Sequence, residues 1–170
     1  MNILFVTNYF YPVRGGVENQ VYNLSKELIK RGHKVEVWCS DSSRSGRINK
    51  LEEIFEKIKI RRFPTLFKIG DFGVFFPGIF DELRNSNFDV VHVHVFRHFH
   101  NLAPFFTRTK CFITPHWPNY PKELRSPLTN LLINIFDALF GKFILNRYKK
   151  ILCVTGLEKE WFIKKFNIKE

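Results

Sequence analysis

The sequence predicts an α/β fold with a mostly parallel sheet of about six to seven strands and helices on both faces. Short runs rich in Val, Ile and Phe alternate along the 170 residues with segments whose apolar residues recur at helical spacing. Strands that alternate with helices form parallel sheets, and the density of apolar residues in the runs is typical of strands covered on both faces. We therefore expect a single doubly wound, Rossmann-like domain over residues 1–170.

Six segments rich in β-branched and aromatic residues are expected to form the strands. They cover residues 3–7, 34–40, 58–63, 89–95, 111–114 and 151–155. The second follows Gly32, a residue type that commonly ends helices. The third has the weakest pattern of the set.

Two amphipathic helices are expected. Between the first two strands, apolar residues recur every three or four positions from Val17 to Ile29, which predicts a crossover helix. A longer helix is expected over residues 124–148. There the same rhythm continues through Leu128, Leu131, Leu132, Ile135, Phe136, Leu139, Phe140, Phe143 and Ile144. We interpret this stripe as core packing rather than as a groove for a partner.

The chain is strongly basic. It has 27 Lys and Arg residues against 16 Asp and Glu residues, and the net charge of +11 favours an anionic partner such as phosphate, nucleic acid or a membrane surface. No signal peptide is recognised at the N-terminus. The apolar region after Pro127 is interrupted by Asp137 and Lys142, so we expect no membrane-spanning segment and a soluble or peripheral protein.

Three cysteines, Cys39, Cys111 and Cys153, lie in separate apolar segments. They are too few and too scattered for a disulfide framework. We expect reduced thiols and a cytoplasmic location.

The turn after the first strand contains the first candidate site. Gly15 and Gly16 stand just before the crossover helix, where a ligand can approach the backbone and unpaired N–H groups attract an anion. A phosphate would fit there, although a tight turn is the simpler interpretation of a Gly-Gly pair. The dinucleotide fingerprint G-x-G-x-x-G is absent from the sequence, which removes the main support for an NAD-dependent enzyme.

Histidines near two predicted strand ends are the second group of candidates. His92 and His94 point to the same face of one strand, and His116 follows the next strand. Ligands bind at the carboxyl ends of strands in an open parallel sheet, where an imidazole can donate to a sugar hydroxyl or share a proton. A metal-dependent hydrolase using His92, His94 and His116 and plain packing are both alternatives, and no Cys or carboxylate lies at a compelling ligand spacing.

Two further segments have a structural and a functional interpretation. Thr155 and Glu158 have the spacing of a capping box at a helix start. Residues 63–77 contain five phenylalanines near a glycine-rich break and follow the basic residues Lys57, Lys59, Arg61 and Arg62. This segment could dock on an anionic membrane and receive a lipid-linked acceptor. The alternative is ordinary packing of Phe75, Phe76, Ile79, Phe80 and Leu83 as a helix face.

Taken in order, these segments resemble the N-terminal domain of glycosyltransferase family 4, whose members have the GT-B fold. The matching motifs are Asn2-Ile3-Leu4-Phe5-Val6, Gly15-Gly16-Val17-Glu18, Leu28-x-x-Arg31-Gly32-His33-x-Val35, Asp89-Val90-Val91-His92-Val93-His94, Thr114-Pro115-His116 and Val154-Thr155-x-x-Glu158. Each motif is short, but their order and intervals are specific, and the resemblance covers essentially the whole chain.

The resemblance implies retaining transfer of a hexosyl group from a nucleotide sugar, linked to UDP or GDP, to a hydroxyl group of a sugar or of a lipid-linked acceptor. It implies a role in the synthesis of glycans, glycolipids or cell-envelope polysaccharides, with no cofactor and no obligatory metal ion. The residues it implies are His116 for catalysis and Gly15, Gly16, Arg14, Glu18, His94 and Thr155 for binding the donor phosphates and the acceptor.

One departure from the family is large. The family's second domain, which carries paired glutamates and a basic residue for the donor diphosphate, has no counterpart in the sequence. We therefore expect no transferase activity from this chain alone. We expect a cytoplasmic protein, peripheral on the inner face of the cell membrane. A non-catalytic nucleic-acid-binding module is a further alternative, but the charge is spread along the chain without a recognition signature, so no nucleic-acid partner is expected.

Overall fold

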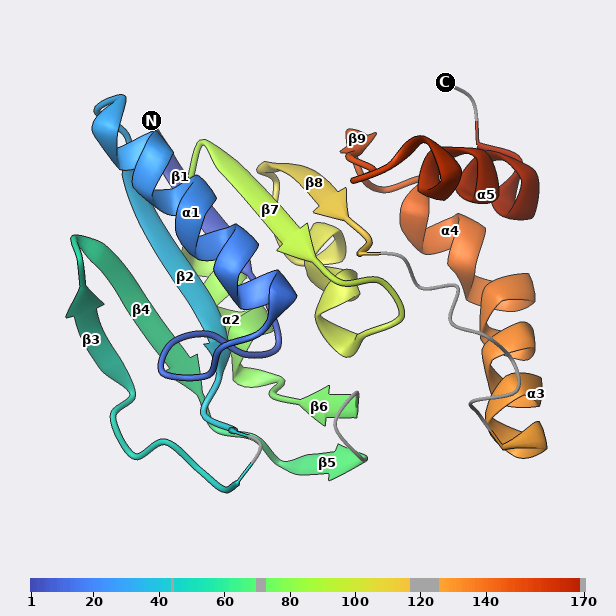
Figure 1. Ribbon diagram of the computed structural model, residues 1–170, viewed down its shortest axis with the longest axis horizontal. Coiled ribbons are helices and arrows are strands. Elements are labelled where there is room, and N and C mark those ends of the chain that lie inside the picture. The colour runs from blue at the N-terminus through green and yellow to red at the C-terminus, as the bar shows by residue number, and fades with distance from the viewer. Residues whose placement is uncertain (44, 70–72, 117–125, 169–170) are drawn as a thin grey trace.

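The computed structural model of the chain describes residues 1–43, 45–69, 73–116 and 126–168 (Figure 1). Its main sheet contains β1 (Asn2–Val6), β2 (Lys34–Ser40), β3 (Glu52–Phe55), β4 (Ile58–Phe63), β7 (Val90–His94), β8 (Lys110–Thr114) and β9 (Lys150–Ile151). The strand order is β3-β4-β2-β1-β7-β8-β9, and every pairing is parallel except that of β3 with β4. The predicted α/β class and mostly parallel sheet are therefore confirmed.

Helices cover both faces of this sheet because successive residues of each strand point to opposite sides. Helix α1 (Gly16–Lys30) lies in front of the sheet and α2 (Gly78–Asn85) lies behind it in Figure 1. Phe5 of β1 belongs to the same buried cluster as Val21 of α1, whereas its neighbour Leu4 packs in a second cluster with Leu83 of α2. The 3-10 helix η1 (Phe99–Phe105) follows β7.

Three elements differ from the strands that the sequence predicts. Strand β3 and the separate hairpin of β5 (Phe67–Ile69) with β6 (Gly73–Phe75) were not predicted. The strand expected over residues 151–155 ends at Ile151, where the chain turns away from the sheet toward α5 (Gly156–Phe166). All three lie at the edges of the fold, where strands are short and their apolar pattern is weak.

The long helix predicted over residues 124–148 is present between Pro127 and Leu145. It consists of α3 (Pro127–Phe136), the π-helical turn η3 (Asp137–Gly141) and α4 (Lys142–Leu145). Residues 124 and 125 lie outside the described residues. By length and composition these 19 residues could also cross a membrane, whereas the sequence led us to expect no spanning segment because Asp137 and Lys142 interrupt the apolar region.

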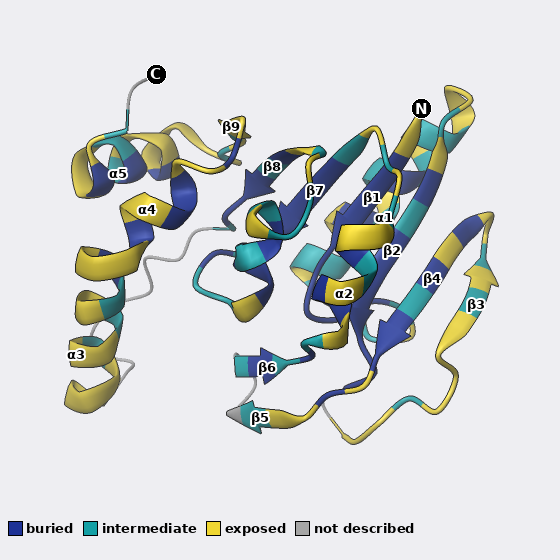
Figure 2. Cartoon of the chain, turned by 180° about the vertical axis from the view of Figure 1, so that it is seen from behind, coloured by how far each residue is buried: buried dark blue, intermediate teal, exposed yellow. Residues whose placement is uncertain are grey.

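The interpretation of the apolar stripe in this helix as core packing is wrong for most of its residues. Leu128 and Leu139 are each 65% exposed, and Leu131, Leu132, Ile135, Phe140 and Phe143 are also exposed, whereas Ile144 is buried. Figure 2 shows the mainly exposed surface of α3. The spacing of apolar residues determines which side chains share a helix face, but it does not determine whether that face turns toward the core.

Two of the four basic residues that were expected to support membrane docking, Arg61 and Arg62, are engaged within the fold. Arg62 is only 2% exposed and donates hydrogen bonds to the carbonyl of Tyr11 and to the carboxylate of Glu53. Arg61 forms a bidentate pair with Glu82, with N···O distances of 2.8 and 2.7 Å. These two arginines therefore do not form a free cationic surface.

The phenylalanines that follow are mostly packed, as the alternative interpretation held, although Phe75 and Phe76 precede the helix instead of lying on it. Phe76, Ile79, Phe80 and Leu83 are buried, and the ring of Phe75 stacks on Phe67 and meets Phe99 edge to face. Leu66 and Phe67 remain exposed. Residues 70–72 of this segment lie outside the described residues.

We predict that Gly141→Ala destabilises the fold. A Cβ atom on Gly141 would overlap the ring of Phe166, which is held by ring contacts with Phe96 and Phe162 and cannot easily move. Urea unfolding should show a loss of about 1–2 kcal/mol, because overpacking outweighs the better helix propensity of alanine. Gly156→Ala is the matched control, since its Cβ would meet no atom within 4 Å. Equal midpoints for both variants would contradict this prediction.

Candidate functional site

The strand order reverses beside β1, and the candidate site lies there. Strands β2, β3 and β4 lie on one side of β1, and the chain then crosses to the other side of β1 to form β7, β8 and β9. The loops that leave β1 and β7 therefore run in opposite directions. Open α/β sheets bind ligands in the crevice between such loops. Gly15 and Gly16 follow β1, His94 ends β7, and His116 follows β8. All four residues therefore lie at the carboxyl edge of the sheet.

The Gly15-Gly16 pair leaves open the start of α1. Gly15 is the N-cap in extended backbone with φ of −164°, and no side chain caps the helix. A Cβ atom on Gly16 would meet nothing within 4 Å. Neither glycine has a positive φ, so the simple tight-turn explanation does not account for them. What glycine provides here is space above the first N–H groups of the helix, which have no acceptor within the helix itself and therefore suit an anion.

Two charged residues flank this helix start. Arg14 is exposed immediately before the pair, and Glu18 lies half-buried in the first turn of α1. A carboxylate in the first turn interacts favourably with the helix dipole. A functional role for Arg14 and Glu18 stays a prediction.

His94 and His116 are hydrogen-bonded to each other. Nδ1 of His94 lies 2.9 Å from Nε2 of His116. His94 is fully buried and its ring meets Phe5 edge to face, whereas His116 is half-buried. The structure thus brings together the two histidines that the sequence singled out first, and it leaves one of them accessible.

The direction of this hydrogen bond follows from burial. Nε2 of His94 has no hydrogen-bond partner among the described residues. If it carried a proton, a donor would be buried unpaired, which is more costly than a bare acceptor on a neutral imidazole. We therefore assign the proton of His94 to Nδ1, which donates to Nε2 of His116. His116 must then carry its own proton on Nδ1, which gives the accessible ring an N–H donor.

The histidines of the site are neutral near pH 7. Burial lowers the pKa of His116 to about 4 and that of His92 to about 4, and it holds the pKa of His94 well below its usual range. A group with so low a pKa is a poor proton carrier at neutral pH. The site can therefore recognise a hydroxyl group through a neutral hydrogen bond and does not present an imidazolium.

The loops at these strand ends contain unusual backbone conformations. Val95, Arg97 and His116 have φ values of 69°, 67° and 57°, in the left-handed region that such residues rarely adopt. Backbone bonds hold them in place, including Val95 N–H to the carbonyl of Thr114 at 2.9 Å. Strain of this kind concentrates at binding and catalytic sites.

His92 is turned to a different partner. Its Nε2 lies 2.8 Å from the hydroxyl of Thr114, so the nitrogens of His92, His94 and His116 do not converge on one point. Within the described ranges, no group of three or more His, Cys, Asp or Glu could hold a metal ion. This arrangement gives the metal-dependent hydrolase no support.

Thr155 has the structural role that its spacing predicts. Its hydroxyl accepts the N–H of Glu158 at 3.1 Å, and the carboxylate of Glu158 accepts the N–H of Val154 at 2.6 Å. The first bond is the N-cap half of the expected capping box at the start of α5, whereas the Glu158 carboxylate reaches one residue beyond the N-cap. A contact between Thr155 and a donor stays a prediction.

Sequence reasoning missed three residues that join the loops of the site. The side-chain amide of Asn8, just after β1, donates to Nδ1 of His98 at 2.8 Å. Nε2 of His100 donates to the carbonyl of His94 at 2.8 Å. Burial lowers the pKa of His98 to about 3 and that of His100 to about 4. The alternate spacing of His98 and His100 just beyond β7 could have indicated these two histidines, whereas the sequence carries no comparable signal for Asn8.

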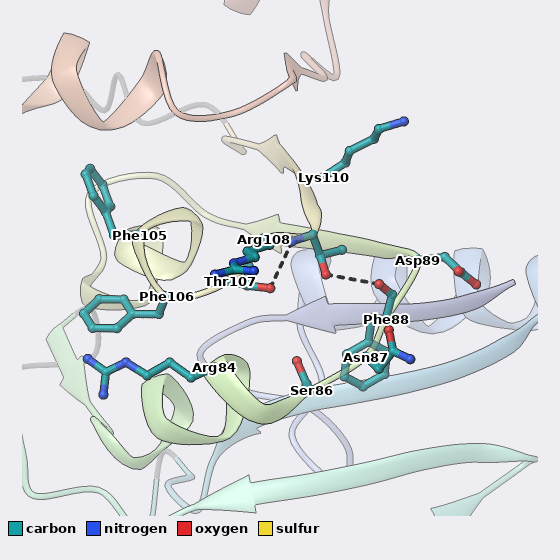
Figure 3. Close-up of a pocket in the computed structure, with 11 residues that line it drawn as sticks. Arg84, Ser86, Asn87, Phe88, Asp89, Phe105, Phe106, Thr107, Arg108 and Lys110 are labelled. Carbon is teal, nitrogen blue, oxygen red and sulfur yellow. Dashed lines mark hydrogen bonds between the residues drawn. The ribbon is translucent and has the colours of Figure 1, made fainter.

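A hollow of about 790 Å³ lies at the opposite, amino edge of the sheet (Figure 3). It is open to solvent between the starts of β7 and β8, and Arg84, Asp89 and Lys110 point away from one another around it. The guanidinium of Arg84 lies 4.8 Å from the ring centre of Phe106. Polar groups converge at the carboxyl edge and not here, so we do not assign function to this hollow.

Comparison with protein families gives a match over residues 14–170 to the model described as Glycosyltransferase Family 4. The chain belongs to glycosyltransferase family 4. The family 4 domain also resembles sucrose-phosphate synthase from Thermosynechococcus elongatus, with a TM-score of 0.59 at 14% identity over 97% of this chain and 45% of that chain. At this identity the likeness shows the fold alone, which is that of a GT-B domain.

Curated relatives of this family 4 domain carry a common name. The phosphatidylinositol N-acetylglucosaminyltransferase GPI3 subunit of Saccharomyces cerevisiae is 26% identical, covering 94% of this chain and 35% of its own length. A human phosphatidylinositol N-acetylglucosaminyltransferase subunit is 59% identical over 34 residues, which are 20% of this chain and 7% of that protein. The chain thus spans about a third of the yeast relative.

We predict that the fold loses stability as the pH falls from about 6.5 toward 4. The buried histidines stay neutral in the fold but take up protons in the unfolded chain below its pKa of about 6.5, so acid favours unfolding by up to about 1.4 kcal/mol per pH unit for each fully buried histidine. Thermal unfolding followed by circular dichroism between about pH 7 and 5 should show a steadily falling midpoint. An unchanged midpoint over this range would mean that these histidines ionise freely in the fold.

Proposed function

We propose that this chain is the acceptor-side half of a retaining glycosyltransferase that moves a hexosyl group from a UDP- or GDP-linked sugar to a hydroxyl group. The observation that carries the proposal is the open, uncapped start of α1 at the same sheet edge as the His94–His116 pair. The helix start suits a diphosphate, and the histidine pair presents an N–H group to a sugar hydroxyl.

In this proposal the start of α1 binds the donor diphosphate. Its first N–H groups and the positive end of the helix dipole stabilise the negative charge that grows as the nucleoside diphosphate departs. Arg14 adds positive charge beside the same position. We propose that no obligatory metal ion is involved, and that fixed dipoles and cationic side chains perform the charge stabilisation.

His116 contacts the transferred sugar in this proposal. Its Nδ1–H donates to a sugar hydroxyl, which fixes the ring of the donor relative to the acceptor. His94 acts as a positioning residue, because its hydrogen bond selects the tautomer and orientation of His116. The lowered pKa of His116 keeps this donor neutral throughout the physiological range.

The names of the relatives suggest the substrates. The yeast and human proteins are named as transferring N-acetylglucosamine to phosphatidylinositol. We propose a lipid-linked acceptor of this kind for the whole protein, and a location on the cytoplasmic face of a membrane. Their names also call them subunits, so an assembly with further chains is part of this proposal.

The donor's nucleotide is expected to bind mainly outside this chain. The chain covers 35% of the yeast relative, and the proposal places the remaining contacts to the nucleotide and diphosphate in the other part of the enzyme. The chain alone is therefore expected to give no turnover with any nucleotide sugar.

We predict that Gly16→Ala weakens donor binding without lowering the stability of the fold. The added methyl group meets no atom of the fold, so the unfolding midpoint should stay the same or rise slightly. In the active enzyme the same methyl group would crowd the diphosphate and raise KM for the nucleotide sugar by about tenfold. Gly156→Ala, with equal free space at another helix start, is the control. An unchanged KM in the Gly16→Ala variant would show that the donor diphosphate does not bind at the start of α1.

We predict that a chimera of this chain with the rest of the yeast GPI3 subunit transfers N-acetylglucosamine from its UDP donor to phosphatidylinositol. The assay uses yeast membranes that lack their own GPI3 subunit, with this chain alone as the inactive comparison. His116→Ala should lower kcat by about 10²-fold, as loss of a single oriented donor does in other enzymes. His94→Ala should have a smaller effect.

His94→Asn distinguishes positioning from packing, because its amide can donate from nearly the same place as Nδ1. If His94→Asn keeps more transfer activity than His94→Ala, and His94→Phe does not, the positioning role is supported. A folded chimera that transfers no sugar from UDP-N-acetylglucosamine, UDP-glucose or GDP-mannose would contradict the proposed function.

A further inference from the structure

The helix from Pro127 to Leu145 carries an apolar surface that faces away from the domain. We define the outer helix surface as Leu128, Leu131, Leu132, Ile135, Leu139, Phe140 and Phe143, which are 44–65% exposed. Their spacing of three or four residues places most of them along one side of the helix. In the described chain, no residue of α3 is buried. A helix on a soluble domain normally turns such a stripe inward.

The inner side of the same helix combines one buried ion pair with apolar contacts to the core, and together they fix this orientation. Asp137 is 4% exposed and accepts a bidentate pair of hydrogen bonds from Arg97, at 2.9 and 2.6 Å. Lys165 of α5 lies 3.7 Å from the same carboxylate. Ile144 and Leu145 are buried nearby. Turning the apolar stripe inward would expose these two residues and separate a buried ion pair, which costs several kcal/mol.

The exposed charged residues on this helix and just after its C-terminal end are basic. Asp137 is the one acidic residue in the sequence between Ser126 and Lys150, and it is buried. Lys142, Lys149 and Lys150 are exposed. The guanidinium of Arg147 lies 5.0 Å from the ring centre of Phe105 and 5.4 Å from that of Phe143. Exposed aliphatic side chains with bordering cations and aromatic rings are typical of helices that lie in a lipid headgroup layer.

We propose that the outer helix surface docks this chain on an anionic phospholipid membrane, with the helix lying along the surface. A spanning orientation is disfavoured because Asp137 ties the middle of the helix to the domain. Anionic lipid fits better than a second protein because the exposed charges of this region are mainly lysines, a residue type that is depleted at protein interfaces and attracted to anionic lipid.

Docking of this helix would place the candidate site at the membrane. Arg97, which grips the inner side of the helix, is three residues beyond His94 in the loop that leaves β7. The carboxyl edge of the sheet is thereby linked directly to the docked helix. This step rests on the proposed function, since a lipid-linked acceptor would present its hydroxyl group at that level. The docking itself does not depend on transferase activity.

The test is cosedimentation of the 170-residue chain with vesicles. One set contains phosphatidylcholine and phosphatidylserine, and the other contains phosphatidylcholine only. A variant carrying Leu131→Gln, Ile135→Gln and Leu139→Gln alters exposed side chains alone, so it should fold normally. The matched control carries Ile54→Gln and Leu157→Gln, two exposed apolar residues on β3 and α5.

The chain is expected to bind anionic vesicles, with weaker binding at high salt and on phosphatidylcholine alone. The triple variant should bind at least about tenfold more weakly, while the control variant binds like the original chain. Lys142→Gln together with Lys149→Gln should weaken binding to the anionic vesicles by about fivefold per charge removed and leave residual binding to phosphatidylcholine unchanged.

Three results would overturn the proposal: no binding to anionic vesicles, equal binding by the triple variant, or concentration-dependent dimers in sedimentation velocity that the triple variant abolishes. The last would show that a second copy covers the surface. Because no donor or acceptor is present, loss of vesicle binding contradicts docking alone. Failure of the transfer assay with vesicle binding intact contradicts the proposed function alone.

Discussion

The parallel pairing of β1 with both β2 and β7 determines where every group of the candidate site lies. Ile3 is in register with Val35 on one side and Val90 on the other. The carboxyl ends of neighbouring parallel strands meet at one edge, so the loops after β1, β7 and β8 must lie together. A slip of β7 by one residue would turn His92 and His94 to the opposite face of the sheet. The contact between His94 and His116 would then be lost.

Burial and the chemistry of the site are linked. Packing of the histidines between loops removes them from water, which keeps their rings neutral and makes each ring nitrogen either a donor or an acceptor. The neutral histidines at this edge can therefore recognise a ligand only through directed hydrogen bonds. Positive charge comes instead from the helix start and from exposed basic residues. Such a division suits a ligand with an anionic part and a neutral, hydroxyl-rich part, as membership of glycosyltransferase family 4 leads one to expect.

Much of this architecture could be predicted from the sequence, for identifiable reasons. Strands covered on both faces leave continuous apolar runs, and the crossover helix leaves a clear amphipathic pattern. The contact of His94 with His116 was not predicted, because it depends on register: His94 pairs with Thr114, and His116 lies two residues further on. The outward face of the helix at Leu131 could not be predicted either, because the deciding partner, Arg97 for Asp137, is 40 residues away in sequence.

The extended conformation of Gly15 has a consequence for the evolution of this domain. Almost any residue could adopt it, and serine or aspartate at this N-cap would strengthen the helix by a few tenths of a kcal/mol. Selection for a more robust protein would therefore readily replace the glycine, and only selection for access to the helix start opposes that drift. Homologues that no longer bind a ligand at this helix start should carry a larger residue in place of this glycine, even where the sequences of their strands are unchanged.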